Sequence, residues 1–511
     1  MRFPSPSAVF RALLHWGLVT SLLLLTLLTA GGAILHWRSW SYQQLDDAEP
    51  LAAKRQYLAT VAATGFDSAG SKPPNIVLIL FDDLGFGDIG AYGASAIRTP
   101  QLDALAAGGV RLTDYYAPAP VCSPSRAGLL TGRYPVRTRM TQVPMTPGGT
   151  TDAPLAWAPL YELQRAAGVA TRLPLEEITL AEVLQAAGYD TAMFGKWHLG
   201  SVSPSLPTER GFDLFEGLLS SNDQLPNPYY RGRRVVEASP VDQTTLTERY
   251  TQAAVEFIET PRDVPFFLYL PHTFPHRPLH PSAAQRGKSK AGLYGDVVED
   301  LDQSVGRVLA ALRNAGSLEE TLVLVTSDNG PWFQGSPGPH RGRKTDLFDG
   351  GFRVPFLAYW PGTLPAGAVR RQMAMGIDIF PTALALAGIA PPGDRVIDGR
   401  DMLPMLREGA SSAHEALYFY WAEMLGAVRS GRFKYHIRRP IPVGYAPAPL
   451  MLQMPVGPWL FDLQFDSDES YDVSDRQPEV MERLGTLLRR RVEQDGLDPR
   501  GFGSASPRAL P

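Results

Sequence analysis

Two pairs of polar residues follow strongly apolar runs in this 511-residue chain. Asp82 and Asp83 follow "NIVLILF", while Asp328 and Asn329 follow "TLVLVTS". Apolar, β-branched runs of this length are typical of strands buried on both faces of a parallel sheet. Either polar pair alone would be read as an ordinary turn. Together, three carboxylates and one amide offer hard oxygen ligands, so they predict a site for Ca²⁺ or Mg²⁺ rather than Zn²⁺.

The chain has a single cysteine, Cys122, in the stretch "VCSPSRAGLLTGRYP". A lone cysteine cannot form an internal disulfide, and its small, polar neighbours argue against an inert buried thiol. Pro124 or Ser125 is suited to open a helix that ends at Gly132. Cys122 then lies at a helix N-terminus, where backbone N–H groups favour an anion.

Arg126 supplies a second anion-binding group close to Cys122. A phosphatase of the Cys-x5-Arg type requires an arginine at position 128, which is Gly128 here, so that chemistry is excluded. A thiol protease that pairs Cys122 with a distant histidine is an alternative, but it leaves the predicted cation site without a role.

Further basic side chains are candidates for the same site. Lys196 and His198 in "GKWHLG" follow another strand-like run, and Lys344 lies in the basic loop "RGRKTDLFDGGFRVP". Taken alone, Lys196 and His198 favour a role without a ligand, whereas Lys344 is as compatible with a solvated charge as with a ligand contact. The stretch "PHTFPHRPLH" offers alternative zinc ligands, which are His272, His276 and His280. The prolines between them disfavour helical spacing, and the carboxylates already favour a harder metal.

The elements that must position these residues alternate between strand and helix patterns. Segments 190–195 and 265–270 are also strand-like, so four predicted strands end in polar residues, and open α/β sheets bind ligands at that edge. Helical patterns lie between them, with a capping box at Thr179 and Glu182 and an amphipathic stretch at 295–316. The predicted fold class is therefore α/β, a large mixed, mainly parallel sheet flanked by helices.

The pattern changes after residue 410, where "EALYFYW", "AVRSGRFKYHI" and "WLFDLQFD" indicate short antiparallel strands, followed by an amphipathic helix. We therefore expect a smaller C-terminal α+β domain at 411–511, after a catalytic domain at 73–410. The Pro-, Gly- and Thr-rich segment 141–171 predicts a loop near the mouth of the site. Residues 41–72 are mixed and polar, which indicates a linker that is helical in part.

The N-terminal segment 1–40 is a membrane anchor or a signal. Residues 13–35 carry no Asp, Glu, Lys or Arg and are long enough to cross a bilayer, while "AGGA" offers a signal cleavage site. Arg2 and Arg11 favour a cytoplasmic N-terminus, so the rest of the chain would be exported. We expect a bacterial inner-membrane protein facing the periplasm, or a periplasmic or secreted protein if the segment is cleaved. The net charge of −4 argues against nucleic acid as a partner.

Taken together, these stretches resemble the type I, formylglycine-dependent sulfatases, in particular the arylsulfatase A-like branch of the alkaline phosphatase superfamily. The signature C-x-P-S-R followed by x-x-x-L-T-G-R is matched in full from Cys122 to Arg133. "PNIVLILFDDLGFGDIGAYG", "GKWHLG", "TSDNGP" and "DGGFRVPFLAYWPG" also resemble the family and occur in its order. The resemblance covers Pro74 to Asp472.

The resemblance implies that a maturation enzyme oxidises Cys122 to Cα-formylglycine, with C-x-P-S-R as its recognition signal and the hydrated aldehyde as the nucleophile. It implies a cation, usually Ca²⁺ with Mg²⁺ as the alternative, held by the modified residue at 122 and by Asp82, Asp83, Asp328 and Asn329. It further implies that Arg126 supports the hydrate and that His198 orients it and assists elimination. Sulfate oxygens would be held by Lys196, His276 and Lys344, and Ser221 would lie near the hydrate.

The implied activity is hydrolysis of sulfate esters through a sulfated-enzyme intermediate, with aryl sulfates, sulfated glycans and sulfolipids as candidate substrates. A phosphonate monoester or phosphodiester hydrolase of the same fold is the alternative, because the tetrahedral groups have similar shape. A non-catalytic, membrane-anchored binding protein on the same scaffold is disfavoured, since no position of the catalytic set has been lost.

Overall fold

A ten-stranded sheet with helices on both faces forms the body of the protein in this computed structural model, which describes residues 5–65, 72–147, 154–437, 440–441, 452–453 and 457–502. The strand order is β11-β2-β10-β9-β1-β8-β4-β5-β6-β7. The neighbours β9, β1, β8, β4 and β5 run parallel, whereas β10, β6 and β7 pair antiparallel. The strands of this sheet are β1 (Asn75–Phe81), β2 (Val110–Leu112), β4 (Asp190–Lys196), β5 (Leu214–Leu218), β6 (Tyr229–Arg231), β7 (Arg234–Glu237), β8 (Phe266–Pro271), β9 (Thr321–Ser327), β10 (Phe356–Tyr359) and β11 (Ala368–Arg370).

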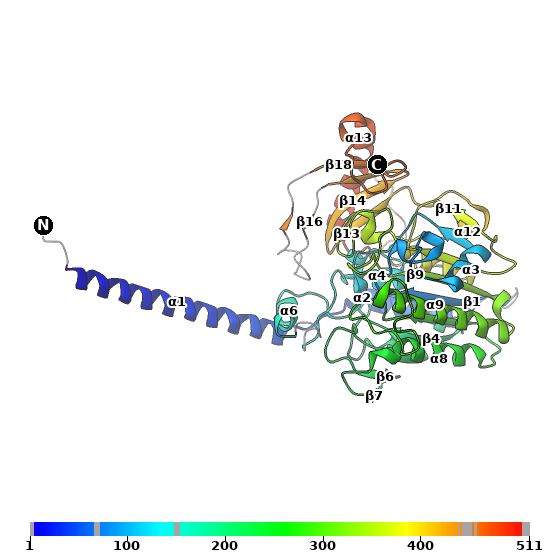
Figure 1. Ribbon diagram of the computed structural model, residues 1–511, viewed down its shortest axis with the longest axis horizontal. Helices are drawn as coiled ribbons and strands as arrows, with labels where there is room; N and C mark the ends of the chain where they lie inside the picture. The colour runs from blue at the N-terminus through cyan, green and yellow to red at the C-terminus, as the bar shows by residue number, and fades with distance from the viewer. Residues whose placement is uncertain are drawn as a thin grey trace.

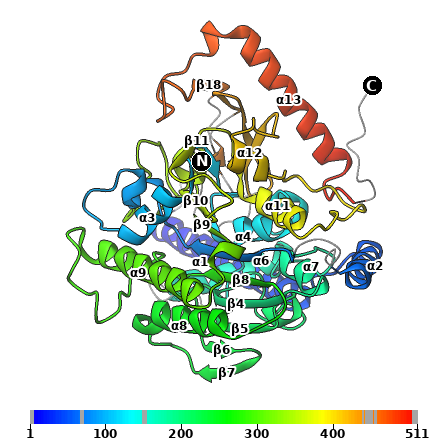
Figure 2. The same cartoon turned by 90° about the vertical axis from the view of Figure 1, so that its right-hand side faces the viewer.

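Helices cover both faces of the sheet, as Figure 2 shows. The helices are α1 (Pro6–Ser41), α2 (Ala48–Thr64), α3 (Pro100–Gly108), α4 (Cys122–Thr131), α5 (Pro135–Thr138), α6 (Pro154–Ala166), α7 (Leu180–Ala186), α8 (Leu246–Glu259), α9 (Gly292–Asn314), α10 (Asp349–Phe352), α11 (Ile379–Leu386), α12 (Leu403–Glu408) and α13 (Pro478–Leu497). Alternate residues of β1 pack against α4, α7 and α11 on one face and against α3, α8 and α9 on the other. Burial on both faces explains why β1 is apolar from Ile76 to Phe81.

The predicted fold class is confirmed, and the four strand-like runs correspond to β1, β9, β8 and β4. The helix predicted at Thr179 is α7, and its capping box is formed. The Thr179 hydroxyl oxygen accepts from the Glu182 N–H at 3.1 Å, and the Glu182 carboxylate accepts from the Thr179 N–H at 2.8 Å. The capped helix positions the following strand, β4, which ends at Lys196.

The C-terminal part forms a separate antiparallel sheet in the order β13-β14-β15-β18, with α13 packed against it. Its strands are β13 (Leu417–Trp421), β14 (Met424–Ser430), β15 (Phe433–His436) and β18 (Trp459–Asp462). Short strands elsewhere are β3 (Tyr115–Tyr116), β12 (Ala374–Met375), β16 (Pro440–Ile441) and β17 (Leu452–Gln453). The antiparallel strands and the final amphipathic helix agree with the pattern of the sequence.

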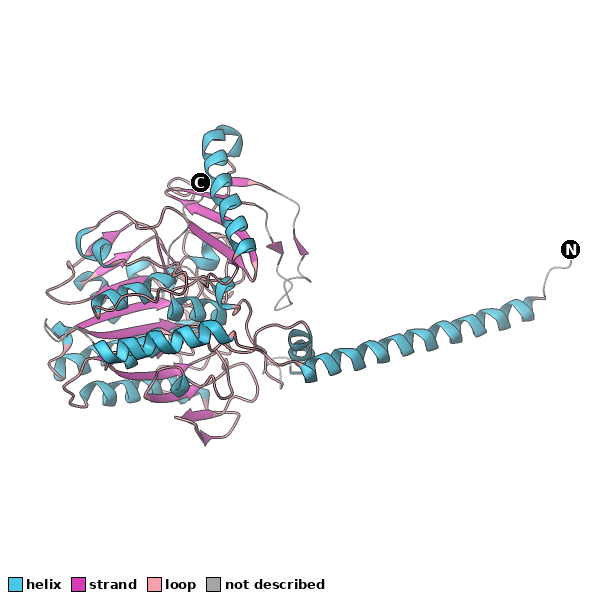
Figure 3. Cartoon of the chain, turned by 180° about the vertical axis from the view of Figure 1, so that it is seen from behind, coloured by secondary structure: helices cyan, strands magenta, loops and turns pink. Residues whose placement is uncertain are grey.

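The N-terminal helix α1 extends away from the body (Figures 1 and 3). Its segment His15–Ser41 is long and apolar enough to cross a membrane, a test that a signal sequence also passes. The segment expected as a partly helical linker contains α2, which packs against α7. Lys54 of α2 is buried and donates to the Glu182 carboxylate at 2.6 Å, so α2 is an integral part of the body.

Two local expectations were wrong. The segment 141–171 is not a continuous loop, because it contains α6, which packs against the end of α1; residues 148–153 lie outside the described chain. The helix expected to open at Pro124 or Ser125 begins at Cys122. Proline is tolerated at Pro124 because N–H groups in the first helical turn have no intrahelical acceptor. The predicted stop at Gly132 is confirmed by its left-handed φ of 69°.

Candidate active site

The strand ends bring the four predicted oxygen-bearing side chains together. β1 and β9 are parallel neighbours in register from Asn75 and Thr321 to Phe81 and Ser327, so the residues that follow them meet at one edge. The Asp83 N–H donates to the Asp328 carboxylate at 3.2 Å, and the Asn329 amide donates to the Asp83 carboxylate at 2.7 Å. All four are buried.

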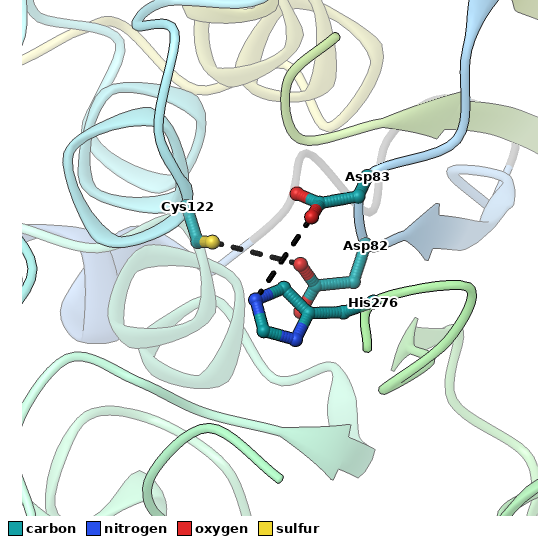
Figure 4. Close-up of side chains that lie close together, drawn as sticks. All are labelled: Asp82, Asp83, Cys122 and His276. Atoms are coloured by element: carbon teal, nitrogen blue, oxygen red, sulfur yellow. Dashed lines mark hydrogen bonds and ion pairs between the residues drawn. The ribbon is translucent and has the colours of Figure 1, made fainter. Parts of the chain in front are cut away.

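Helix α4 directs Cys122 at this edge. The Cys122 Sγ lies 3.5 Å from Asp82 Oδ1, and Figure 4 shows the side chains of Cys122, Asp82, Asp83 and His276 pointing toward one another. One potential ligand atom from each of these four residues lies within 4.8 Å of the others. Burial raises the pKa of the Cys122 thiol above its usual range, and Asp82 adds to this effect. Burial therefore disfavours the thiolate that a thiol protease needs as its nucleophile.

Arg126 lies one helical turn below Cys122 and is fully buried. Its guanidinium donates to the Asp328 carboxylate at 2.9 Å, to the Asp82 carboxylate at 3.1 Å and to the backbone carbonyl of Lys196 at 2.6 Å. These partners follow or end β9, β1 and β4. Arg126 therefore fixes three strand ends relative to α4, and its three acceptors offset the cost of burying its charge.

Two lysines place ammonium groups beside the paired aspartates. The Lys196 Nζ donates to Asp82 Oδ2 at 2.5 Å and to the Ser221 hydroxyl at 3.0 Å. The Lys344 Nζ donates to both carboxylate oxygens of Asp83, at 2.7 and 2.9 Å, and lies 3.3 Å from the Cys122 Sγ. Both lysines are buried, so their charges act at low effective dielectric.

The carboxylates of Asp82 and Asp328 lie close together, and the pKa values of both are shifted from their usual range. Burial raises the pKa of Asp328 to about 6, and the charge of neighbouring Asp82 adds to the shift. Burial acts in the same direction on Asp82, but Lys196 and Arg126 outweigh it and hold the pKa of Asp82 below its usual range. Crowded carboxylates of this kind are stabilised by a cation.

Asn329 provides an independent test of whether a cation fits. Its Nδ2 donates to Asp83 and to the Gly330 carbonyl, whereas its buried Oδ1 has no hydrogen-bond partner within the described residues. An unpaired buried acceptor costs free energy of about 1–3 kcal/mol. An oxygen-preferring divalent cation bound beside the carboxylates of Asp82 and Asp83 would give this amide oxygen a partner, so the donor set fits the predicted cation.

A residue that the sequence analysis did not single out, Asn222, orients His276. The Pro278 carbonyl can only accept, and it takes a hydrogen bond from Asn222 Nδ2 at 3.3 Å, so Asn222 Oδ1 faces His276. The His276 Nδ1–H donates to that oxygen at 3.0 Å, and Nε2 lies 3.9 Å from Asp83 Oδ2. Burial lowers the pKa of His276, and Lys344 adds to the shift. The only sequence signal for Asn222 was its position after Ser221.

A small pocket opens beside Cys122 and contains His198. It is lined by Cys122, Val143, Met145, His198, Ser221, Asp223, Gln224 and His276. Neither ring nitrogen of His198 has a hydrogen-bond partner in the described part of the chain, although the side chain is buried. Burial lowers the pKa of His198 well below its ordinary value, and Lys196 adds to this. A neutral imidazole with both nitrogens unpaired is suited to bind a group inside the pocket.

The zinc alternative is not supported, because the three histidines do not converge. His272 lies under α9, where its Nε2 is 3.2 Å from the Ser304 hydroxyl, and its ring stacks on Phe81. His280 is partly exposed, beside the Phe274 ring. Only His276 reaches the aspartates, where the sequence analysis had placed it as a sulfate-binding residue.

Carboxylates, ammonium groups and imidazoles meet at the carboxyl edge of a mainly parallel sheet, beside the start of a helix. This arrangement is suited to an enzyme that hydrolyses esters of tetrahedral oxyanions. The model of the Sulfatase family matches residues 74–389, and that of the C-terminal part of N-sulphoglucosamine sulphohydrolase matches residues 343–441. The chain belongs to the sulfatase family, and it is an enzyme that hydrolyses sulfate esters.

Relatives are similar over most of the chain. Mouse N-acetylgalactosamine-6-sulfatase is 40% identical over 409 residues, which are 75% of this chain and 76% of that protein. Human arylsulfatase A is 37% identical over 498 residues, 87% of this chain and 92% of that protein. The structure of the PsFucS1 sulfatase from Pseudoalteromonas has a TM-score of 0.71 at 27% identity, covering 90% of this chain and 97% of that one. Phosphonate monoester hydrolase of Agrobacterium radiobacter, at 21% identity and a TM-score of 0.55, shares the fold alone.

Proposed function

We propose that this sulfatase works through a Cα-formylglycine formed from Cys122, next to a divalent cation held by Asp82, Asp83, Asp328 and Asn329. The observation that carries the proposal is the position of the Cys122 Sγ, between Asp82 and Lys344 at the first residue of α4. That sulfur stands where the oxygens of the modified residue would lie. A hydrated aldehyde there would provide one hydroxyl to attack sulfur and a second to release the sulfate.

The cation, as Ca²⁺ or Mg²⁺, would supply Lewis-acid stabilisation of negative charge on the sulfate group. The chain's own residues do the rest. Lys344 and Lys196 place ammonium groups beside position 122, where they would stabilise charge on the transferring group. His198 lines the same pocket, its ring nitrogens have no partner among the described residues, and it is suited to take a proton from the second hydroxyl. Lys344 would give a proton to the leaving oxygen, or His276, oriented by Asn222, would do so in its imidazolium form.

We propose that the natural substrate is a sulfate ester rather than a phosphodiester. Mouse N-acetylgalactosamine-6-sulfatase and human arylsulfatase A, at 40% and 37% identity, are sulfatases, whereas the phosphonate monoester hydrolase, at 21% identity, shares only the fold. We expect matured enzyme to hydrolyse an aryl sulfate with a kcat/KM at least about 10-fold above that for the matching aryl phosphodiester, a difference of about 1.4 kcal/mol. A higher kcat/KM for the diester would contradict the assignment. Mass analysis of the peptide containing Cys122 must show formylglycine, and an unmodified thiol in active protein would refute the proposed nucleophile.

Lys344 offers a test of the charge-stabilising role. Replacing Lys344 with methionine keeps the length of the side chain but removes the ammonium group, so kcat/KM on an aryl sulfate is expected to fall by about 100- to 1,000-fold. The matched control is Lys54→Met, which removes another buried ammonium group, paired with Glu182 and remote from the pocket. The control is expected to lower the denaturation midpoint and leave kcat/KM of the folded enzyme unchanged. Equal losses of kcat/KM in both variants would count against a direct role of Lys344.

A further inference from the structure

Helix α6 holds the rim of the active-site pocket. Gln164, on the last turn of α6, is 3% exposed and makes two hydrogen bonds to the segment that lines the pocket. Its Nε2 donates to the Val143 carbonyl at 2.9 Å, and its Oε1 accepts from the Met145 N–H at 2.9 Å. Val143 and Met145 line the pocket together with Cys122. The position of α6 therefore sets the position of the pocket rim.

The same turn of α6 is attached to the end of α1. Arg165, next to Gln164, donates to the Ser39 carbonyl at 3.0 Å and to the Tyr42 carbonyl at 3.1 Å, and its guanidinium lies 5.5 Å from the centre of the Tyr42 ring. Ser39 is only 1% exposed. Figures 1 and 3 show α6 between α1 and the body.

A second set of contacts fixes the chain that follows α1. The Asp46 carboxylate accepts two hydrogen bonds from Arg172, at 2.6 and 2.8 Å, and Gln44 donates to the Arg172 carbonyl at 2.9 Å. Lys54 then anchors α2 in the body. These contacts hold the non-helical segment 42–47 that joins α1 to α2, so the direction of α1 and the direction of the pocket are coupled.

The exposed side chains of α1 indicate where a bilayer surface would lie. The span His15–Ser41 exposes leucines along its length, and a bilayer core needs about 20 such residues. Trp37 and Trp40 are 63% and 77% exposed near its C-terminal end, and tryptophan is enriched at the membrane–water interface. The interface therefore falls at Trp37–Tyr42, where Arg165 attaches α6.

We propose that α1 is retained as an anchor, that the pocket mouth opens onto the membrane surface, and that the natural substrate is a sulfate ester whose apolar part stays in the bilayer. This inference rests on the proposed function, because it assigns a substrate class to the same site. The rim residues Val143 and Met145 are apolar, which suits an apolar leaving group. A sulfated amphiphile could present its headgroup to Cys122 without leaving the membrane.

The test uses matured, full-length enzyme in phosphatidylcholine vesicles with two substrates, a soluble aryl sulfate and a dioleoylglycerol sulfate in the same vesicles. The test variant combines Arg165→Ala with a flexible Gly-Ser insert after Tyr42, so it stays on the membrane but loses the fixed orientation. It is expected to hydrolyse the vesicle substrate about 10-fold more slowly or worse, with aryl sulfate turnover within about twofold of the parent. The control carries the same insert after the exposed Arg233, in the β6–β7 turn, and should match the parent on both substrates.

The outcomes separate the two proposals. Loss of aryl sulfate hydrolysis by the parent enzyme would refute the proposed function itself. The parent could hydrolyse the aryl sulfate while the Arg165→Ala variant with the insert after Tyr42 hydrolyses the vesicle substrate as fast as the parent. That result would overturn only the inference about orientation. A mature N-terminus beyond Ser41 in the native host, or a strong preference for a soluble sulfated oligosaccharide over the vesicle substrate, would also overturn that inference.

Discussion

The Cys122→Ser variant is expected to release at most one equivalent of alcohol per enzyme and no free sulfate, so that sustained turnover falls by about 1,000-fold or more. Serine offers one hydroxyl at the position of the Cys122 Sγ, where Lys344 and Asp82 can still orient an attack on sulfur. The carbon of serine carries no second hydroxyl to expel the sulfate. The chain would therefore stall as a sulfate ester of residue 122, visible as the mass of one added sulfo group.

The control for this prediction is the unchanged chain made without a formylglycine-generating enzyme. Its buried thiol should support neither a burst of alcohol nor turnover, because it lacks both hydroxyls of the hydrate, while its denaturation midpoint stays close to that of the matured protein. Continuous sulfate release by the serine variant would show that a second hydroxyl on residue 122 is unnecessary. Turnover by the chain with an intact thiol would also contradict the proposed nucleophile.

The central residues of the proposed site could be predicted because each follows, or lies within, a strong local sequence pattern. Asp82 follows the apolar run 76–81 and Asn329 lies just after a strand that is apolar over 322–325, and such strands form the centre of a parallel sheet, where their carboxyl ends meet. Arg126 follows Cys122 by four residues, so one helix places both on the same face. The sequence could indicate this part of the site without knowledge of the tertiary structure.

No local sequence pattern predicted the residues whose role depends on tertiary contacts. Asn222 orients His276 only because the Pro278 carbonyl, far along the chain, fixes its amide. Gln164 and Arg165 lie in a segment whose proline, glycine and threonine content indicated a loop, and their helix packs on α1 from more than 100 residues away. The start of α4 was misjudged for a related reason. Pro124 favours the first helical position, but the extended Val121 already ends the preceding segment and lets Cys122 begin the helix.

Removal of divalent cations is expected to lower the activity of the matured enzyme by about 100-fold or more and to lower its denaturation midpoint, with Ca²⁺ restoring both. Ca²⁺ is expected to raise the denaturation midpoint up to a maximum. In Asn329→Ala, the Ca²⁺ concentration that gives half of this rise should be about 10- to 100-fold higher than in the parent. The reason is that Asn329 Oδ1, buried and without a partner in the described residues, is the acceptor that the cation would use. Calorimetry at a series of Ca²⁺ concentrations measures this without depending on turnover.

Asn75→Ala is the matched control, because Asn75 is an equally buried asparagine at the opposite end of β1. Its amide donates to the Thr321 hydroxyl and accepts from the Phe266 N–H, so its loss should lower the midpoint through two broken hydrogen bonds. The Ca²⁺ concentration that gives half of the Ca²⁺-dependent rise in denaturation midpoint should nevertheless be the same as in the parent. Equal shifts in both variants would mean that Asn329 acts only through general stability, and a midpoint indifferent to Ca²⁺ in the parent would exclude the proposed cation site. A shift confined to Asn329→Ala would place the cation at the carboxyl edge of β1 and β9, beside Cys122.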